Sequence, residues 1–175
     1  MTVFSEHGYY GASMNEVAGH AGVTKPVLYQ HFPSKRDLYV ELVEGVSRKL
    51  GDQITDAVRG NTEPRLQAEA ALGAYFTFVE QNQREFQLLF GSGAPRADEF
   101  GSGSRLVEDH MGDTIAGLLD HRIEADVRLL VGRAIVGMSE GVCHHWLSQD
   151  SRPSADSVAK QLAVLLMDGL GGFTR

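Results

Sequence analysis

Residues 3–38 alternate helix-forming and helix-breaking residues at short intervals, which constrains the fold more than any other feature of the chain. Gly8 and Gly11 break any helix begun by the first residues. Ser13 and Glu16 then form a capping box, in which a hydroxyl and a carboxylate bond free backbone amides reciprocally. The sequence therefore predicts that a new helix begins directly after Ser13.

A turn and a second short helix follow the capping box. Gly22 suits the left-handed residue that ends a helix sharply, and Thr24 can cap the next helix with Pro26 tolerated in its first turn. On that next helix Leu28 and Phe32 share a face and are expected to point inward. The first of the two helices is expected to bury one stripe, made of Met14, Val17, Ala18 and Ala21.

The charges around the second helix favour a nucleic-acid partner. Pro33 ends this helix, and Ser34 with Asp37 predicts a cap for the next one. Lys25 and Lys35 each lie in the first turn of a helix, where the macrodipole disfavours a cation. A phosphate would reverse that sign, because free amides and a lysine together bind anions. Each feature alone occurs in ordinary helical proteins, so the DNA hypothesis depends on their ordered combination.

The same stretch resembles the DNA-binding domain of TetR-family transcriptional regulators, in the block GYYGASMNEVAGHAGVTKPVLYQHFPSKRDL. The resemblance implies that three side chains contact phosphates, those of Tyr29, His31 and Lys35. Ser13 and Met14, at the start of the preceding helix, would touch the backbone of the other strand. The residues that it places at or near the bases are Thr24, Lys25, Pro26, Val27 and Gln30.

The chain departs from this family at its start. Family members normally carry two or more further helical turns before the position of Val3. Without them Met14, Val17 and Leu28 would lose apolar cover, at roughly 1.5–3 kcal/mol for each side chain. A late start codon, a trimmed chain and a degenerate regulator are the alternatives. A rival function follows from the last of these: a dimeric small-molecule-binding or interaction module whose shortened helix-turn-helix no longer binds DNA.

Composition is consistent with a cytoplasmic regulator. Residues 1–50 hold five of the 16 basic and five of the 23 acidic residues, so the rest of the chain carries the net charge of −7. A helix-turn-helix segment without net charge, joined to an acidic remainder of the chain, argues against nonspecific nucleic-acid binding. It favours binding through a small local surface. The single Cys143 excludes an internal disulfide. Neither a signal peptide nor a membrane-spanning helix is expected.

An all-α fold is predicted, because no alternating strand pattern and no internal repeat occurs. We expect a helix-turn-helix DNA-binding domain over residues 1–45, followed by an antiparallel helical ligand-binding and dimerisation domain over residues 46–175. Residues 91–104 are rich in Gly and Ser, and a flexible loop is expected there. Beyond the first domain, helices are expected over residues 35–59, 65–82, 84–90, 105–121, 125–149 and 155–171.

The last two of these helices are apolar on two sides, and such helices must be covered on two sides. A four-helix bundle made by two copies supplies the second cover, as the resemblance also implies; burial of both sides within one subunit is the alternative. Gly132, Gly137 and Gly141 each cost about 1 kcal/mol in a helix, which close helix crossing would offset. Such a homodimer would place two reading helices about 34–36 Å apart on a palindromic operator. The expected stripe is Val127, Val131, Ala134, Met138, Val142 and Trp146, widened by Leu130, Ile135 and Val136.

Aromatic residues of the middle helices are candidates for an effector pocket, although aromatics at helical spacing more often form core. The TetR resemblance implies that a pocket lies between these helices. A small apolar or aromatic effector would then release a repressor from its operator by a population shift, carried by helix 35–59. The candidate ligand-binding residues are Tyr75, Phe76, Phe86, Phe90, Met111, His144 and Trp146.

An enzymatic function is not expected. Cys143 and His144 are adjacent, so on a helix they diverge by about 100° and do not form a nucleophile–base pair. His144 and His145 lack a partner at the spacing of a zinc site, and no nucleotide-binding glycine motif occurs. Neither a cofactor nor a metal is predicted.

Overall fold

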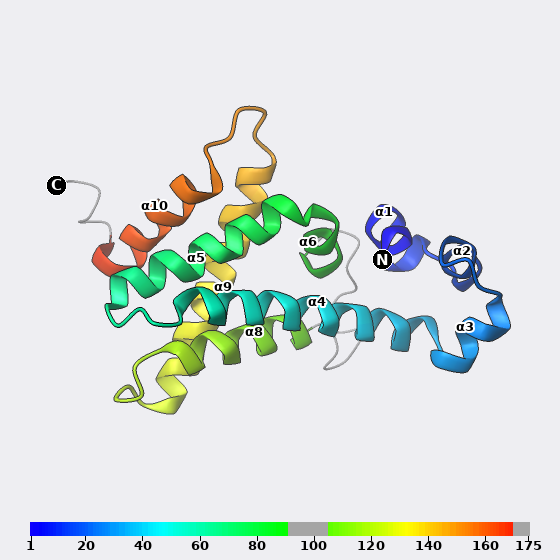
Figure 1. Cartoon of the computed structure of the whole chain (residues 1–175), viewed down its shortest axis with the longest axis horizontal. Helices are drawn as coiled ribbons and strands as arrows, with labels where there is room; N and C mark the ends of the chain where they lie inside the picture. Colours follow the sequence, from blue (N-terminus) through cyan, green and yellow to red (C-terminus); the bar gives the residue numbers. More distant parts are fainter. Residues whose placement is uncertain (91–104, 170–175) are drawn as a thin grey trace. The chain divides into compact units, whose positions relative to one another are not determined.

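The computed structural model describes residues 1–90 and 105–169, and in these residues every regular element is a helix (Figure 1). The all-α prediction is therefore confirmed. No helix within those two ranges combines the length and the apolar character that a bilayer crossing requires. The helices are α1 (Thr2–Gly11), α2 (Met14–His20), α3 (Lys25–His31), α4 (Lys35–Val58), α5 (Pro64–Gln81), α6 (Gln83–Phe90), α8 (Arg105–Leu118), α9 (Ala125–Leu147) and α10 (Ala155–Asp168).

Helix boundaries follow the capping and breaking residues closely, with exceptions in α1 and α8. Gly8 breaks the helical path as expected, at φ 66° and ψ 175°. Gly11, however, is helical, and the chain leaves α1 at Ala12, which is extended. Helix α8 ends at Leu118, earlier than expected, because Asp120 turns the chain by accepting a hydrogen bond from the amide of Arg122. The expected loop over residues 91–104 lies outside the described residues.

The chain divides into two compact units, and the first comprises residues 1–48 and 82–107. Helices α1 and α6 pack together in it. Its core contains the rings of Phe4, Tyr9 and Tyr39, with the centroids of Tyr9 and Tyr39 5.1 Å apart. The buried Tyr39 hydroxyl donates to the Leu88 carbonyl at 2.8 Å, and burial raises the pKa of Tyr39 to about 12. The predicted division of the chain at residue 45 stays a prediction.

The second unit comprises residues 49–81 and 108–175. Helix α10 packs along α5, as Figure 1 shows, and the fully buried side chains of Phe76, Phe78 and Val79 form the α5 part of its core. Helices α8 and α9 meet at two glycines. A Cβ built on Gly132 of α9 would collide with the carbonyl oxygen of Gly112 on α8.

This close contact determines which side of α9 faces inward. The expected stripe differs from the one observed: Ala134 is exposed and Val127 is 43% exposed, while Ile135 and Val136 are buried. The bare backbone at Gly132 lets α8 approach, so the positions that flank Gly132 on the same face become core. The buried positions of α9 are Gly132, Ile135, Val136, Ser139, Cys143 and Trp146.

Candidate functional site

The capping box predicted at the start of α2 is present. The Ser13 amide donates to the Glu16 carboxylate at 2.9 Å, and the Glu16 amide donates to the Ser13 hydroxyl at 3.3 Å. Hydrogen bonds from Ser13 lower the pKa of the Glu16 carboxyl below its ordinary value. Met14 begins α2 and is only 6% exposed, so its side chain packs inward with Val17 and Ala18. Of the two residues predicted to contact DNA here, Ser13 and Met14, only Ser13 has an exposed polar side chain.

The turn between α2 and α3 forms as the sequence predicts, but one expected bond is missing. Gly22 has φ 68°, and the Val23 amide donates to the Ala18 carbonyl at 3.0 Å, which ends α2. Thr24 occupies the cap position of α3 with an extended backbone, yet no hydrogen bond joins its hydroxyl to the amides of α3. Its hydroxyl is exposed instead of satisfying the helix start.

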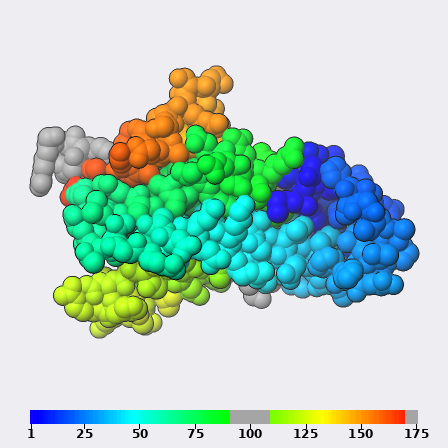
Figure 2. All heavy atoms as spheres, in the orientation of Figure 1, coloured from blue at the N-terminus to red at the C-terminus, as the bar shows by residue number. Residues whose placement is uncertain are grey.

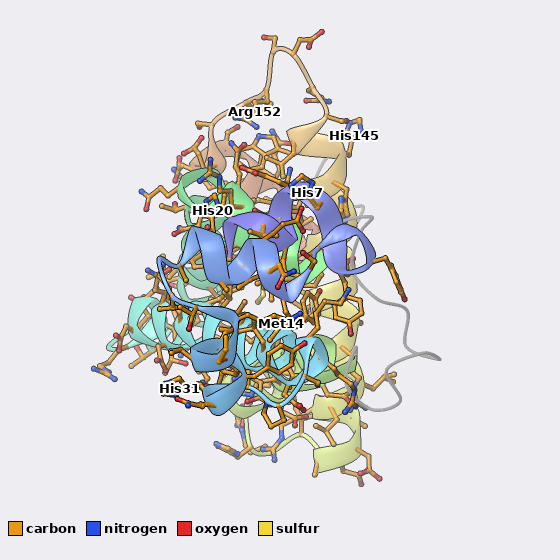
Figure 3. All side chains as sticks on the ribbon, turned by 90° about the vertical axis from the view of Figure 1, so that its right-hand side faces the viewer. His7, Met14, His20, His31, His145 and Arg152 are labelled. Carbon is orange, nitrogen blue, oxygen red and sulfur yellow. The ribbon has the colours of Figure 1, made fainter. Side chains whose placement is uncertain are left out.

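Helix α3 buries one residue and exposes the rest. Leu28 is buried, whereas Tyr29 is 41% exposed and the Lys25 ammonium lies 5.8 Å from the centre of its ring. His31 points away from the helix-turn-helix in Figure 3, whereas Met14 lies among its helices. The predicted DNA-binding residues that are exposed on or beside α3 are Thr24, Lys25, Pro26, Val27, Tyr29, Gln30 and His31.

Lys35, the first residue of α4, has internal partners that the sequence did not indicate. Its ammonium donates to the Tyr9 carbonyl at 2.8 Å and to the Ala12 carbonyl at 2.9 Å. It also lies 4.5 Å from the centre of the Tyr9 ring. Carbonyls at the end of a helix need donors, but pairing across more than twenty residues leaves no local signal. The cap of α4 is the predicted one, since the Asp37 amide donates to the Ser34 hydroxyl at 3.1 Å.

Three of the predicted ligand-binding residues meet in the second unit. The Phe76 ring lies 5.2 Å from that of Tyr75 and 5.7 Å from that of Trp146, centre to centre. The Trp146 indole N–H donates to the Pro153 carbonyl at 2.8 Å, in the connection between α9 and α10 that projects in orange in Figure 2. Met111 is also buried.

The polar groups of this aromatic cluster are unusual. The Tyr75 hydroxyl is buried and makes no well-formed hydrogen bond within the described residues; it interacts with the Cys143 thiol, which is a weak hydrogen-bonding group. Burial raises its pKa well above the ordinary value, so the group stays protonated and is able to donate. The Cys143 thiol is fully buried, and burial raises its pKa to about 12. The sequence indicated that Cys143 forms neither an internal disulfide nor a nucleophile–base pair, but it did not indicate that this residue lies in the core.

The other predicted ligand-binding residues lie elsewhere. Phe86 and Phe90 belong to the first unit, with ring centres 5.2 Å apart on α6. His144 is exposed on α9, and its ring lies 3.7 Å from the Glu140 carboxylate. Its position one residue after the buried Cys143 turns it outward. Among the residues that the structure describes, no group of three or more acidic, His or Cys side chains suits a metal ion.

Residues 1–42 match the profile of a family described as bacterial regulatory proteins, tetR family. These residues therefore form a TetR-family N-terminal domain, and the chain is similar to TetR-family regulators. The matched segment covers α1, α2, α3 and the start of α4, which are the elements that hold the exposed face of α3.

Relatives of this TetR-family chain extend the similarity over both units. It is 29% identical over 170 residues to the transcriptional activator FasR of Mycolicibacterium smegmatis, covering 96% of this chain and 78% of that protein. It is 25% identical over 180 residues to the transcriptional repressor KstR2 of Rhodococcus jostii, covering 97% and 86%. The first name describes an activator of transcription and the second a repressor.

Solved structures show the same fold. FadR of Bacillus subtilis, solved in complex with stearoyl-CoA, has a TM-score of 0.78 at 14% identity and covers 97% of this chain and 94% of its own. FadR of Bacillus halodurans, described as a fatty acid degradation regulator, has a TM-score of 0.78 at 18% identity, covering 97% and 90%. The architecture of the TetR-family chain is therefore shared along nearly its whole length.

Proposed function

We propose that this TetR-family regulator is a ligand-responsive repressor that binds a palindromic operator as a homodimer and is released by a small apolar or aromatic effector. The observation that carries the proposal is the exposed polar flank of α3, next to the single buried Leu28. A helix that is attached by one side and polar on the other is suited to lie in the major groove. The place of action would be the bacterial cytoplasm.

The exposed side chains of α3 divide into two roles. Tyr29 and His31 are placed to hydrogen-bond phosphates, which fixes register without reading sequence. Gln30 carries an amide, the group that pairs with both N6 and N7 of adenine in the major groove. Val27 is apolar and 38% exposed, and such a side chain suits the methyl group of thymine. Specificity would therefore come from Gln30 and Val27.

The exposed side of α9 supports the dimer. Leu130 is 70% exposed and Val127 is 43% exposed, although both are apolar. Ala134, Gly137 and Gly141 continue the same side of the helix and are also exposed. A Cβ built on either of these two glycines would meet no described atom within 4 Å. A smooth apolar face of small residues lets a second copy of α9 approach closely.

The aromatic cluster of the second unit supports an effector with an apolar body and a hydrogen-bond acceptor. Phe76 and Trp146 supply apolar surface, and the Tyr75 hydroxyl offers a buried donor that interacts only with the weak Cys143 thiol. Such a donor gains a stronger hydrogen bond from a ligand oxygen than it has with a thiol. Stearoyl-CoA, present in the FadR neighbour, is one probe of this chemistry.

Release from DNA would follow from a shift between two populations. Helix α4 is continuous over 24 residues and contributes to both units, since the first unit ends at Arg48 and the second begins at Lys49. A ligand that binds one conformation of the second unit more tightly favours that conformation. The continuous helix would transmit the change to α3 because its first turn follows α3 directly.

A gel shift with promoter DNA flanking the gene tests the proposal. Tyr29→Ala should weaken binding to all duplexes alike, because it removes a phosphate contact, whereas Gln30→Ala should relax specificity at one base pair by about 1–3 kcal/mol. Stearoyl-CoA and a small aromatic acid are added as separate arms to look for release. Wild-type protein that leaves every duplex unmoved at low salt contradicts the proposal. If that protein is still dimeric, the rival function of a binding module is favoured.

A further inference from the structure

The ammonium of Lys35 is engaged inside the first unit. An ammonium has three N–H donors, and two of them bond the carbonyls of Tyr9 and Ala12 at 2.8 and 2.9 Å. The ammonium nitrogen also lies 4.5 Å from the centre of the Tyr9 ring, which is within the range of a cation–π interaction. A side chain held in this way has at most one N–H left for a phosphate, and extending toward DNA would cost it these contacts.

The acceptors of Lys35 are themselves anchored. The Tyr9 ring packs edge-on against Tyr39 at 5.1 Å and stacks with Phe4 at 6.3 Å. The Tyr39 hydroxyl in turn donates to the buried Leu88 carbonyl. Both acceptor atoms of Lys35 are backbone carbonyls in and just after the last turn of α1, so they move only if the chain moves.

The contacts of Lys35 link the two ends of the helix-turn-helix. Ala12 immediately precedes the capping box of α2, and Lys35 begins α4. Residues 13–34 between them contain α2, the turn and α3. Lys35 therefore joins the two ends of the helix-turn-helix, so that α3 is held by its packing on α2 and by a fixed exit into α4.

We propose that Lys35 is a positioning residue that clasps the ends of the helix-turn-helix and thereby orients α3, instead of contacting a DNA phosphate. This inference rests on the proposed DNA-binding function and changes the role that the family resemblance implies for Lys35. Loss of the clasp disturbs base contacts, which depend on orientation, more than it disturbs the nonspecific attraction of the remaining charges.

The test compares Lys35→Met with Lys25→Met, its matched control, because Lys25 begins α3 and its side chain is exposed. Affinities for a duplex selected by the wild-type protein from a randomised library and for a scrambled duplex are measured over a range of salt concentrations. All measurements are made well below the unfolding temperature of each variant. Amide hydrogen exchange of residues 13–34 is measured without DNA.

Lys35→Met is expected to lose about tenfold in the ratio of specific to nonspecific affinity, the discrimination of one good base contact, with an unchanged salt slope. Lys25→Met removes an exposed cation from the side of α3 proposed to enter the groove, and it is expected to lower the slope by up to about 0.9, the effect of one lost cation near the phosphates. Exchange of residues 13–34 should be faster in Lys35→Met only. A slope lowered by Lys35→Met would overturn the proposal, and so would an unchanged affinity ratio with reduced thermal stability alone.

A second variant keeps the test decisive if Lys35→Met does not fold. Tyr9→Leu removes the ring from beneath the ammonium and keeps the charge. The clasp predicts a reduced affinity ratio for this variant, whereas a phosphate-binding Lys35 predicts no loss. If wild-type protein binds neither duplex at low salt, the proposed DNA-binding function is wrong. The exchange measurement then shows separately whether the clasp exists.

Discussion

At the scale of single residues, two buried tyrosines differ in how well the hydroxyl is hydrogen-bonded. Tyr39 donates to the Leu88 carbonyl at 2.8 Å in the first unit, whereas the Tyr75 hydroxyl makes no well-formed bond within the described residues and interacts only with the weak Cys143 thiol. A buried hydroxyl without a well-formed bond costs about 1–3 kcal/mol of stability, and such a cost at a site rich in aromatics suits a position reserved for a ligand. The two side chains therefore form a natural pair of test positions.

Tyr39→Phe should lower the free energy of unfolding by about 1–3 kcal/mol, because the Leu88 carbonyl loses its buried donor. Tyr75→Phe should leave the free energy of unfolding unchanged or raise it by up to about 1 kcal/mol, because it removes a polar group whose desolvation is offset only by a weak thiol contact. Urea denaturation of the ligand-free protein measures both. Equal destabilisation by the two substitutions would show that Tyr75 has a bond in solution.

At the scale of elements, the glycines of α9 serve two different purposes. Gly132 lies against α8, where a Cβ would meet the Gly112 carbonyl oxygen and the Ala116 amide nitrogen, the latter at 3.1 Å. Gly137 and Gly141 have open space at the Cβ position within the described chain. The sequence predicted a helix crossing at all three glycines, but among the described residues only Gly132 has another helix close to its Cβ position.

Gly132→Ala should destabilise the protein by about 1–3 kcal/mol through overpacking at the crossing of α8 and α9. This loss runs against helix propensity, which by itself favours Ala over Gly by about 1 kcal/mol. Gly73→Ala on α5 is the control, since a Cβ there meets nothing within 4 Å, and it should be neutral or stabilising. Thermal unfolding of the two variants provides the comparison; a stabilised Gly132→Ala would mean that the helices are farther apart.

At the scale of the whole molecule, the exposed apolar side of α9 requires an explanation. Scattered apolar residues on a surface are ordinary, but Leu130 at 70% exposure lies one helical turn from Val127 on a side continued by small residues. The net charge of −7 lies outside residues 1–50, so a single reading helix has little electrostatic help. Two copies double the number of base contacts, which makes the dimer and the DNA proposal interdependent.

Leu130→Lys should dissociate the dimer, because it places two ammonium groups at a two-fold interface. Sedimentation velocity is expected to show a monomer, and operator affinity should fall about a hundredfold or more as half of the contacts are lost. Leu66→Lys, at an exposed leucine of α5, should leave both properties unchanged. A Leu130→Lys variant that remains dimeric and binds its operator would place the interface elsewhere.

Features that depend on neighbouring residues could be predicted from the sequence alone. The capping boxes at Ser13 and Ser34, the left-handed Gly22 and the kink at Gly8 all depend on groups within a few positions of each other. For the same reason the order of helices and the face that α3 exposes followed from spacing. The helical state of Gly11 was missed because the tertiary packing of α1 outweighs the weak propensity of one residue.

Contacts between residues far apart in the chain were decided only by the tertiary structure. The carbonyl partners of Lys35 lie 23 and 26 positions away. The rotation of α9, which turns Ile135 inward and His144 outward, follows from the crossing at Gly132. Helical periodicity shows that an apolar stripe exists, but it does not show which neighbour covers each side. That choice depends on close packing in three dimensions, for which one-dimensional spacing holds no information.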